Sequence, residues 1–154
     1  MTLTLRQFHA ADDAALISWL RTPEELYLFT GPRLQWPLDS AQLDGLRADA
    51  AFIPFTAELD GTLVGHIELV PTGEGEARIA RVLVAPQSQG RGVGEQLLRV
   101  ALAEAAGRGI HSLTLFVLPD NARAIALYEK LGFDHRGPSD QLQGALLMGL
   151  ELPV

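Results

Sequence analysis

Three glycines occupy alternate positions in the stretch QSQGRGVG, at Gly90, Gly92 and Gly94. A run typical of a β-strand precedes this stretch, and a run typical of a helix follows it. The first turn of a helix has backbone N–H groups without partners, and these groups together with the helix dipole favour an anion. Glycines let such an anion approach the backbone, and Arg91 adds a positive charge. The pattern predicts a phosphate-binding loop or, more simply, a tight turn.

Two common phosphate-binding motifs do not fit this stretch. A Walker A loop ends in Gly-Lys-Ser/Thr, but Gly94 is followed by Glu95 and Gln96. The dinucleotide fingerprint G-x-G-x-x-G needs a glycine where this chain has Glu95 or Leu97, depending on the starting glycine. The remaining arrangement is a strand, a loop of exposed amides and a helix N-terminus that together hold a pyrophosphate.

The composition is that of a globular chain, and it predicts one domain over residues 1–154. The absence of cysteine excludes disulfides and thiol catalysis. The net charge is −7, the arginines are scattered and Lys130 is the only lysine, so we expect no nucleic-acid partner. The four histidines are far apart, so we expect no metal. No secretory signal and no apolar run of roughly 18 residues is visible, which predicts a cytoplasmic protein without a membrane partner.

The hydrophobic periodicity predicts an α/β fold with a mixed β-sheet flanked by helices. We expect strands at 3–8, 51–59, 62–70, 77–85 and 112–118, and two more around Phe133 and at 145–152. Helical patterns begin near Asp12, Pro23, Ser40, Val93 and Asn121. The order that we predict, β-α-α-β-β-β-α-β-α-β-β, counts two helices before the second strand. Pro54 indicates an edge strand or a bulge, and Asp60-Gly61 indicates a hairpin.

The glycine stretch resembles the pyrophosphate motif of the GNAT superfamily of acyl-CoA-dependent N-acetyltransferases. That motif reads Gln/Arg-x-x-Gly-x-Gly/Ala, and residues 89–94 satisfy it. The segment NARAIALYEKLGF, residues 121–133, is similar to the family's second CoA-contacting element, in which an Asn opens a helix and a Tyr precedes Leu-Gly-Phe. The resemblance extends over about residues 55–137. The first 50 residues are similar only in pattern, which looks most like the branch that acetylates ribosomal-protein N-termini.

The resemblance implies acetyl-CoA as the acyl donor and implies roles for several residues. The main chain of Val82, Leu83 and Val84 would pair with the pantetheine arm as an added strand. Asn121 would contact the cofactor, and Tyr128 would point at the thioester sulfur. The pyrophosphate would be held by the amides of Gln89, Gly90, Arg91, Gly92, Val93, Gly94 and Glu95.

Acetyl transfer needs a neutral amine, a hydrogen-bond donor for the oxyanion and an acid for the leaving thiolate. We expect a backbone amide of residues 82–84 as the donor and Tyr128 as the acid; the alternative for Tyr128 is a packed core residue. Some family members have a glutamate base eleven positions before the motif's Gln, where this chain has Arg78. Our candidate base is Glu68, followed by His66 on the same strand face, although both could be solvent-facing residues. An amine that enters already neutral through ordered water is equally open.

The acceptor amine is not specified by the sequence. Family members usually bind it beside the first two helices, where Phe29 and Trp36 are candidates to line the site. Asp39 and Glu24 are candidates to meet a cationic amine there. We expect an amine-bearing small molecule, such as a polyamine, an amino acid derivative or an aminoglycoside, or a protein N-terminus. We also consider a homodimer.

Two functions of different classes follow from these observations. The leading hypothesis is an enzyme that transfers an acetyl group from acetyl-CoA to a primary amine by direct attack in a ternary complex. An acetyl-enzyme thioester intermediate is excluded because the chain has no cysteine to carry the acetyl group. The alternative is a non-catalytic acyl-CoA-binding sensor or partner module, which the missing glutamate base motivates.

Overall fold

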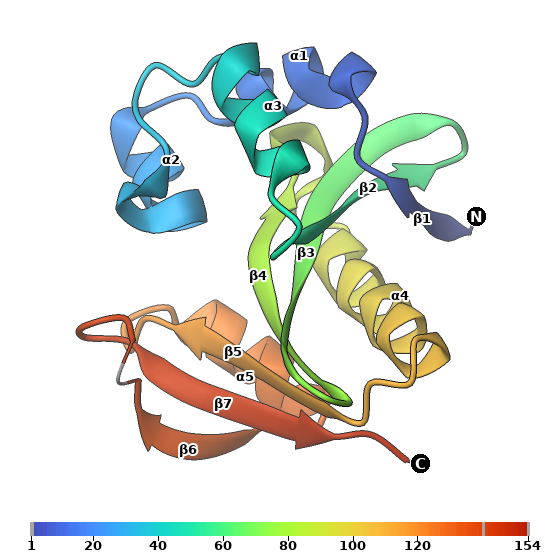
Figure 1. Cartoon of the computed structure of the whole chain (residues 1–154), viewed down its shortest axis with the longest axis vertical. Helices are drawn as coiled ribbons and strands as arrows, with labels where there is room; N and C mark the ends of the chain where they lie inside the picture. Colours follow the sequence, from blue (N-terminus) through green and yellow to red (C-terminus); the bar gives the residue numbers. More distant parts are fainter. Residues whose placement is uncertain (1, 140, 154) are drawn as a thin grey trace.

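A seven-stranded β-sheet runs through the computed structural model, which describes residues 2–139 and 141–153 (Figure 1). The strands lie in the order β1-β2-β3-β4-β5-β7-β6, and neighbouring strands are antiparallel except for β4 and β5. They are β1 (Leu3–Gln7), β2 (Ile53–Leu59), β3 (Thr62–Gly73), β4 (Glu76–Val84), β5 (Ser112–Val117), β6 (Asp134–Pro138) and β7 (Leu146–Glu151). The predicted fold class, a mixed sheet flanked by helices, is confirmed.

Helices cover both faces of this sheet. The α-helices are α1 (Asp13–Trp19), α2 (Pro23–Thr30), α3 (Ser40–Ala48), α4 (Val93–Gly107) and α5 (Ala122–Lys130), with 3-10 turns η1 (Ala10–Asp12), η2 (Gly31–Arg33) and η3 (Pro86–Ser88). Strand β2 shows how the two faces are divided. Phe55 and Ala57 belong to the apolar core that includes α4, whereas Thr56 between them donates its hydroxyl to Asp12 of η1 at 2.8 Å.

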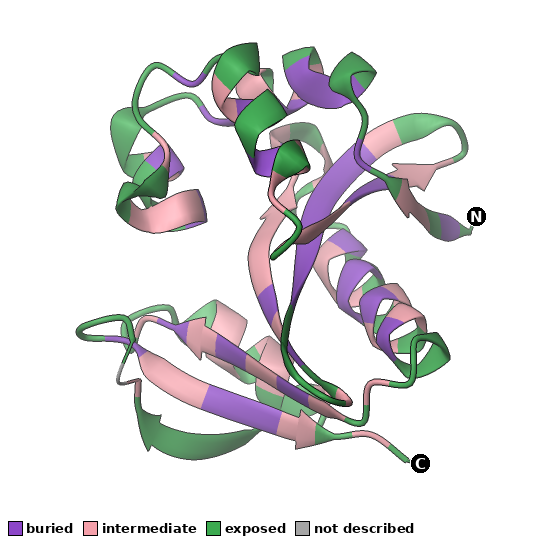
Figure 2. Cartoon of the chain, viewed as in Figure 1, coloured by how far each residue is buried: buried purple, intermediate pink, exposed green. Residues whose placement is uncertain are grey.

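Two apolar clusters hold these layers together (Figure 2). The larger cluster joins the sheet to α4, whose buried residues recur every three or four positions: Val93, Leu97, Leu98, Ala101 and Ala105. Helix α5 packs against the same cluster through Ile125 and Leu127. The smaller cluster joins Phe8 to α1, α2 and α3 through Leu16, Leu26 and Leu43. The glycine loop and α5 thus belong to one packing unit, and α2 belongs to the other.

The segment before β2 folds into three α-helices, where the predicted order counted two. Each of the two later helices has its own N-cap. Thr22 accepts a hydrogen bond from the amide of Glu25 at 3.1 Å, and Asp39 accepts one from the amide of Gln42 at 3.0 Å. Because a capped N-terminus satisfies amides that otherwise lack partners, both starts give a separate helix.

Pro54 lies in an interior strand, so the prediction that it marks an edge or a bulge is wrong. Strand β2 pairs with β1 on one side and β3 on the other, and its register shift falls between Ala57 and Glu58. The carbonyl of Pro54 accepts from the amide of Phe8 at 3.1 Å, so its nitrogen also points toward β1. The last residue of β1 that pairs with β2 is Gln7, which lies opposite Phe55. The N–H that Pro54 lacks would therefore lie beyond the end of the β1–β2 ladder, so no hydrogen bond of that ladder is lost.

Candidate functional site

Strands β4 and β5 separate after three residue pairs. Glu76–Arg78 pairs in parallel with Ser112–Thr114, and no later pair joins the two strands within the described residues. From Ile79 to Val84, the edge of β4 that faces β5 is therefore free of a strand partner. Its N–H and C=O groups can bind an extended ligand as a strand would.

A cleft of about 520 Å³ opens at this separation. It is lined by α2 and the turn after it, by β4, β5 and α5, and by the segment before β7. The lining residues are Tyr27, Leu28, Phe29, Thr30, Gly31, Pro32, Arg33, Phe52, Arg78, Ile79, Ala80, Arg81, Val82, Leu115, Phe116, Val117, Leu118, Asn121, Tyr128, Gln141, Leu142 and Gln143. Three predicted site residues, Val82, Asn121 and Tyr128, are thus brought together from distant parts of the chain.

A β-bulge interrupts β4 inside the cleft. His66 pairs with Leu83 and Glu68 pairs with Ala80, so two residues, Arg81 and Val82, lie opposite Ile67 of β3. Arg81 has a positive φ of 47°, which is uncommon for a residue with a side chain. A bulge leaves its extra residue outside the ladder, so it provides backbone groups without strand partners beside the predicted path of the pantetheine arm.

The glycine loop joins β4 to α4. Gly90 and Gly92 have φ values of 79° and 78°, and a Cβ atom on either would lie in open space. Gly92 is the N-cap of α4, and its carbonyl accepts from the amide of Gln96 at 3.2 Å. The amides of residues 93–95 precede this first helical hydrogen bond and have no intrahelical partner. The loop therefore has free space at Gly90 and Gly92, and amides without intrahelical partners follow it, as an anion requires.

Two predicted contributors to this loop have other contacts. The amide of Gln89 donates to the carbonyl of Pro86 at 3.3 Å, and its side-chain Nε2 donates to the carbonyl of Val84 at 3.1 Å. Gln89 thus fixes the loop against the end of β4. The Glu95 carboxylate accepts from Lys130 at 2.7 Å and from Arg99 at 3.0 Å, and these contacts lower the pKa of Glu95. The negative charge of Glu95 is therefore balanced within the loop that we predict to hold the pyrophosphate, the predicted cradle (residues 89–95).

Helix α5 presents Asn121 and Tyr128 to the cleft. Asn121 is the N-cap, and its side-chain oxygen accepts from the amide of Ala124 at 3.3 Å. Tyr128 lies seven residues later, or about two turns, which returns it to a similar side of the helix. Burial raises the pKa of the Tyr128 phenol. The phenol therefore holds its proton at neutral pH and can act as a donor.

His66, Glu68 and Arg81 form a buried hydrogen-bonded group behind the cleft. Glu68 lies 2.7 Å from Nε2 of His66 and accepts from Arg81 Nη1 at 2.5 Å. The side chains of His66 and Glu68 are 2% and 0% exposed, so the alternative that they face solvent is wrong. They are not among the residues that line the cleft, whereas Arg81 is. The prediction that His66 and Glu68 share one strand face is compatible with their burial, because a carboxylate that is paired with an arginine can be enclosed.

The predicted acceptor residues are only partly brought together. Phe29 lines the cleft, but Trp36, Asp39 and Glu24 are not among its lining residues. Asp39 instead caps α3. The cleft is also lined by residues that no sequence pattern predicts as site residues: Tyr27, Leu28, Arg33, Arg81 and Leu142. No spacing pattern links them, because α2, β4 and the segment before β7 meet only in the folded chain.

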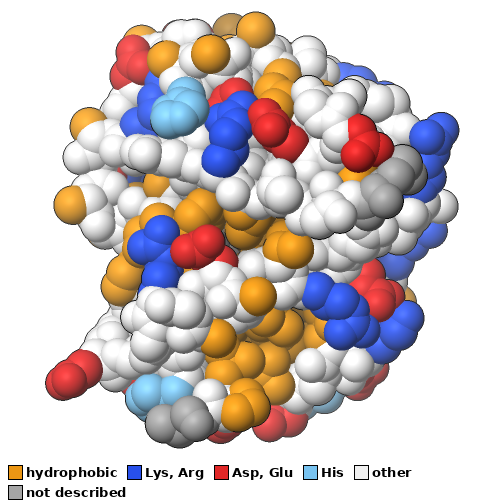
Figure 3. Space-filling view, turned by 90° about the vertical axis from the view of Figure 1, so that its right-hand side faces the viewer, with side chains coloured by type: hydrophobic (Ala, Val, Ile, Leu, Met, Phe, Trp, Pro, Cys, Tyr) orange, Lys and Arg blue, Asp and Glu red, His pale blue; other side chains and the backbone are white. Residues whose placement is uncertain are grey.

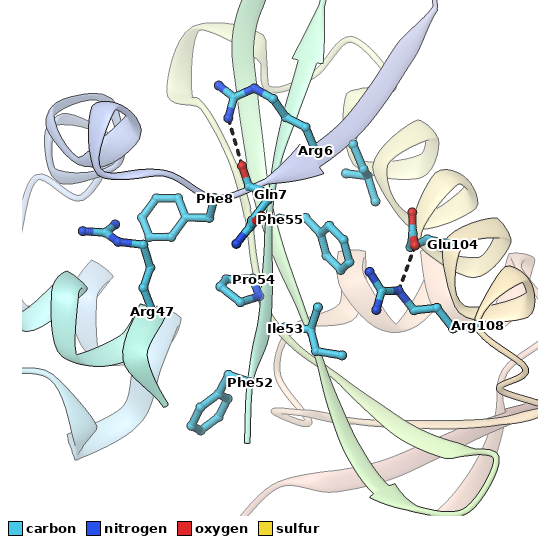
Figure 4. A pocket seen from close by; sticks show the side chains of 11 residues that line it. Arg6, Gln7, Phe8, Arg47, Phe52, Ile53, Pro54, Phe55, Glu104 and Arg108 are labelled. Atoms are coloured by element: carbon cyan, nitrogen blue, oxygen red, sulfur yellow. Dashed lines mark hydrogen bonds and ion pairs between the residues drawn. The ribbon is translucent and has the colours of Figure 1, made fainter. Parts of the chain in front are cut away.

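A second cleft, of about 460 Å³, lies at the end of β1 and β2 (Figure 4). Three arginines line it, and each is already paired with an acid. Arg6 donates to Asp12 at 2.8 Å, Arg47 donates to Asp13 at 2.5 Å, and Arg108 donates to Glu104 at 2.8 Å. None of the predicted site residues lies there. Its arginines have their charges balanced within the protein.

Comparison with known proteins agrees with this geometry. Residues 13–133 match the model of the acetyltransferase (GNAT) family. The chain belongs to this family. The match includes both the glycine loop and α5, the two elements on which the resemblance in the sequence was based. The family assignment made from the sequence is therefore confirmed.

Curated relatives are longer than this chain. The mycothiol acetyltransferase of Streptomyces avermitilis is 33% identical over 135 residues, which cover 85% of this chain and 42% of the relative. The mycothiol acetyltransferase of Tsukamurella paurometabola is 45% identical over 80 residues, which cover 49% of this chain and 27% of the relative. The chain thus spans less than half the length of these relatives.

Solved structures share the fold. Spermidine N-acetyltransferase from Vibrio cholerae, in complex with CoA and spermine, has a TM-score of 0.80 at 24% identity and covers 97% of this chain and 95% of its own. The ribosomal-protein-S18-alanine N-acetyltransferase from Escherichia coli has a TM-score of 0.72 at 22% identity, with 99% and 96% covered. At these identities the likeness concerns the fold, so the ribosomal-protein branch stays a prediction.

Among the described residues, no helix is both long and apolar enough to cross a membrane. No group of three or more His, Cys, Asp or Glu side chains in residues 2–139 and 141–153 is arranged to hold a metal ion.

Proposed function

We propose that the protein transfers an acetyl group from acetyl-CoA to a primary amine by direct attack in a ternary complex. One observation carries this proposal: the separation of β4 from β5. It leaves an edge of β4 free beside a cleft that Val82, Asn121 and Tyr128 line, and the glycine loop joins the end of β4 to α4. The family membership supports the same reaction.

We infer that acetyl-CoA, which supplies the acetyl group as a thioester, binds along this separation. The main chain of Val82, Leu83 and Val84 pairs with the pantetheine arm through the free edge of β4. The amides from Gly90 to Glu95 hold the pyrophosphate, with Arg91 nearby, and Gln89 keeps the loop in place. Asn121 lies where the cleft meets the start of α5. The open space at Gly90 and Gly92 fits this role.

The chain's own residues then serve the reaction in three ways. A backbone N–H at the bulge near Val82 donates to the oxyanion as the amine adds to the carbonyl carbon. Tyr128 gives its proton to the sulfur as the carbon–sulfur bond breaks, and it recovers a proton from solvent. The amine loses one proton overall, so the products are an amide and a free thiol.

The amine must lose a proton before or during its attack on the thioester. Arg81 lies between the cleft and Glu68, so Glu68 can take a proton from the amine only through a relay. We therefore favour an amine that reaches the thioester neutral, with its proton lost to water. Glu68 then acts as a positioning residue that holds Arg81 and His66. A base role for Glu68 or His66 remains the alternative, and a pH profile separates the two.

The first experiment is a titration of acetyl-CoA into the protein by calorimetry, followed by an amine panel in which CoA release is read with a thiol reagent. The absence of cysteine removes any background from the protein. We expect saturable binding and release of CoA with at least one amine. A folded protein that does not bind acetyl-CoA would contradict the proposal.

A non-catalytic acyl-CoA-binding module is the second candidate. The observation that favours it is Arg78, which stands where some family members have a glutamate base and which lines the cleft. Such a module would bind acetyl-CoA but release no CoA with any amine of the panel. Acetylation of one amine with turnover would exclude it.

We propose a cytoplasmic protein whose acceptor is an amine-bearing small molecule or a protein N-terminus. A homodimer is supported by the apolar side chains that gather on the lower part of the face in Figure 3, a feature of association surfaces. Light scattering at several concentrations tests it. The same face shows acidic and basic side chains interspersed, without a broad basic surface for nucleic acid.

A further inference from the structure

The described walls of the cleft carry arginines and no carboxylate. Arg33, Arg78 and Arg81 line it, and no Asp or Glu is among its described lining residues. This contrasts with the chain as a whole, whose net charge is −7. An acceptor with several positive charges would thus meet charges of its own sign in the cleft.

Two of these arginines have their charges balanced within the protein. Arg81 is paired with the buried carboxylate of Glu68 at 2.5 Å, and Arg33 is paired with Asp49 at 2.6 Å. Arg78 has no hydrogen-bond or ion-pair partner among the residues that the structure describes. Its guanidinium lies 5.0 Å from the ring centre of Phe116 across the cleft. Arg78 is therefore a cation in the cleft that remains open to an external anion.

Burial, and next the positive charge of Arg81, lower the pKa of Arg78. Both effects disfavour the charged guanidinium, and an anion bound beside it would relieve both. Arginine nevertheless stays protonated in proteins, so the positive charge persists at neutral pH.

The phosphates of the cofactor are not suited to be this anion. The predicted cradle begins after Val84, six residues beyond Arg78 along β4. At about 3.3 Å per residue this is a separation of roughly 20 Å. Arg78 lies instead where β4 and β5 start to separate, on the strand segment before the bulge. The anion that it binds must therefore belong to another molecule or to another part of the ligand.

We propose that the acceptor is a small amine that carries a carboxylate, and that Arg78 binds this carboxylate. The inference rests on the acetyl-transfer function proposed above. A guanidinium can bind a carboxylate through two parallel N–H···O bonds, which also orients the amine. The rest of the cleft is rich in apolar side chains, with Tyr27, Leu28 and Leu142 exposed at its rim. The substrate class is thus an amino acid with an aromatic or aliphatic side chain.

The arrangement selects against polyamines and aminoglycosides. Such acceptors carry further ammonium groups, which need carboxylates as partners in a partly desolvated site. An amino acid instead brings the negative charge that Arg78 lacks. In addition, the arginines disfavour a protonated amine, which helps the attacking nitrogen to be neutral.

The test uses pairs of amines that differ only in the carboxylate: phenylalanine against 2-phenylethylamine, and leucine against 3-methylbutylamine, with spermidine as a polycation. CoA release gives kcat/KM for each. We expect the amino acids to be preferred by roughly 10- to 100-fold, as a charge-assisted pair allows. Arg78→Gln should remove the preference, mainly by raising KM for the amino acids. Arg78→Lys should restore part of it, and Arg78→Glu should favour the plain amines.

Arg21→Gln is the matched control, because Arg21 lies on the surface, is paired with Glu25 and does not line the cleft. It should leave the preference unchanged. Acetyl-CoA affinity and thermal melting of each Arg78 variant show whether the cofactor site and the fold are intact. A changed acetyl-CoA affinity in Arg78→Gln would overturn the assignment, because Arg78 would then serve the cofactor.

Binding separates this inference from the proposed reaction. Phenylalanine and 2-phenylethylamine are titrated by calorimetry into the protein saturated with CoA. If phenylalanine binds in an Arg78-dependent way but no amine is acetylated, the proposed reaction fails and the anion site stands. If spermidine or the plain amines are acetylated as well as the amino acids, the reaction stands and the inference is overturned. If phenylalanine neither binds nor reacts, the inference is overturned as well.

Discussion

The two walls of the cleft are built from different chemical groups. The wall formed by β4 and α5 offers backbone groups along β4, namely a free strand edge and a bulge, and the first amides of α4 lie beyond the end of β4. The wall formed by α2 and the turn after it offers side chains, including Tyr27, Leu28 and Arg33. The backbone groups of the first wall, the proposed cofactor wall, suit a ligand that is the same throughout a family. The side chains of the second wall, the proposed acceptor wall, and the side chain of Arg78 on β4 suit a ligand that varies.

The two walls also differ in how they are held. The glycine loop and α5 are supported by the larger apolar cluster. The N-terminal helices have a smaller apolar cluster, to which arginine–carboxylate pairs are added: Arg6–Asp12 joins β1 to η1, and Arg47–Asp13 joins α3 to α1. Substitutions in the glycine loop should therefore mainly affect cofactor binding, whereas substitutions in these arginine–carboxylate pairs should affect stability and its dependence on pH.

The largest expected effect is that of Gly92→Trp. Gly92 has a φ of 78° and open space above its Cα, where an indole would fill the proposed cradle. Because several charge-assisted hydrogen bonds would be lost together, we expect acetyl-CoA affinity to fall by about 1,000-fold, or about 4 kcal/mol. Calorimetry measures this affinity directly.

Gly109→Trp is the matched control for backbone strain. Gly109 also has a φ of 78° and open space where a Cβ atom would lie, but it follows the C-terminus of α4. Both variants should lose similar stability, about 1–3 kcal/mol, since both force a side chain into the left-handed region. Equal losses of acetyl-CoA affinity in the two variants would show that strain, rather than the cradle, explains the result.

This contrast also explains how much the sequence could predict. The cofactor wall depends on local backbone geometry, and glycines at 90, 92 and 94 together with Asn121 and Tyr128 leave a readable pattern in the chain. The acceptor wall depends on which segments meet after folding. The sequence therefore suggests Trp36 and Asp39, which do not line the cleft, and gives no sign of Arg33 and Leu142, which do. The burial of Glu68 was missed because its partner Arg81 takes a bulged conformation that strand periodicity does not reveal.

The next largest effect is a loss of stability, expected when the buried group of His66, Glu68 and Arg81 behind the cleft is changed. Glu68→Gln keeps the size of the side chain but leaves Arg81 buried without its counter-charge. We expect a loss of about 3 kcal/mol in the free energy of unfolding. Chemical denaturation followed by the fluorescence of Trp19 measures it. If Glu68 is a positioning residue, kcat/KM should fall at every pH with its profile unchanged; loss of the acidic limb of the profile would instead identify Glu68 as the base.

Two further variants test whether burial of the Glu68–Arg81 pair explains the cost of Glu68→Gln. The double variant Glu68→Gln, Arg81→Met removes both charges and should recover most of the lost stability, because an apolar replacement of a buried pair is often tolerated. Glu58→Gln removes one partner of the partly exposed pair with Arg6 and should cost less than about 1 kcal/mol. A loss as large as that of Glu68→Gln would show that burial is not what distinguishes the two pairs.

Tyr128→Phe tests whether Tyr128 is the acid that protonates the leaving thiolate. It removes the phenol hydroxyl while keeping the ring beside Phe133. We expect kcat to fall by about 100-fold, or about 2.7 kcal/mol, with acetyl-CoA affinity unchanged. Since burial raises the pKa of Tyr128, the protonated acid should persist up to and beyond the ordinary tyrosine range. Activity that survives the substitution would assign Tyr128 to packing.

Apart from the control variants, the smallest effect is expected at Asp12, which anchors the N-terminal helices to the sheet. Asp12 is 4% exposed and accepts from Arg6, from the amide of His9 and from the hydroxyl of Thr56. Burial alone would raise its pKa, but these hydrogen bonds lower the pKa from 3.8 to about 2. The stabilisation is therefore present above pH 3.8 and is lost as the pH falls toward 2. Asp12→Asn should cost about 2 kcal/mol at pH 7 and progressively less in acid, as measured by denaturation at each pH. A cost that does not change with pH would mean that Asp12 acts through its shape and not through its charge, and that the acceptor wall is held by packing as the cofactor wall is.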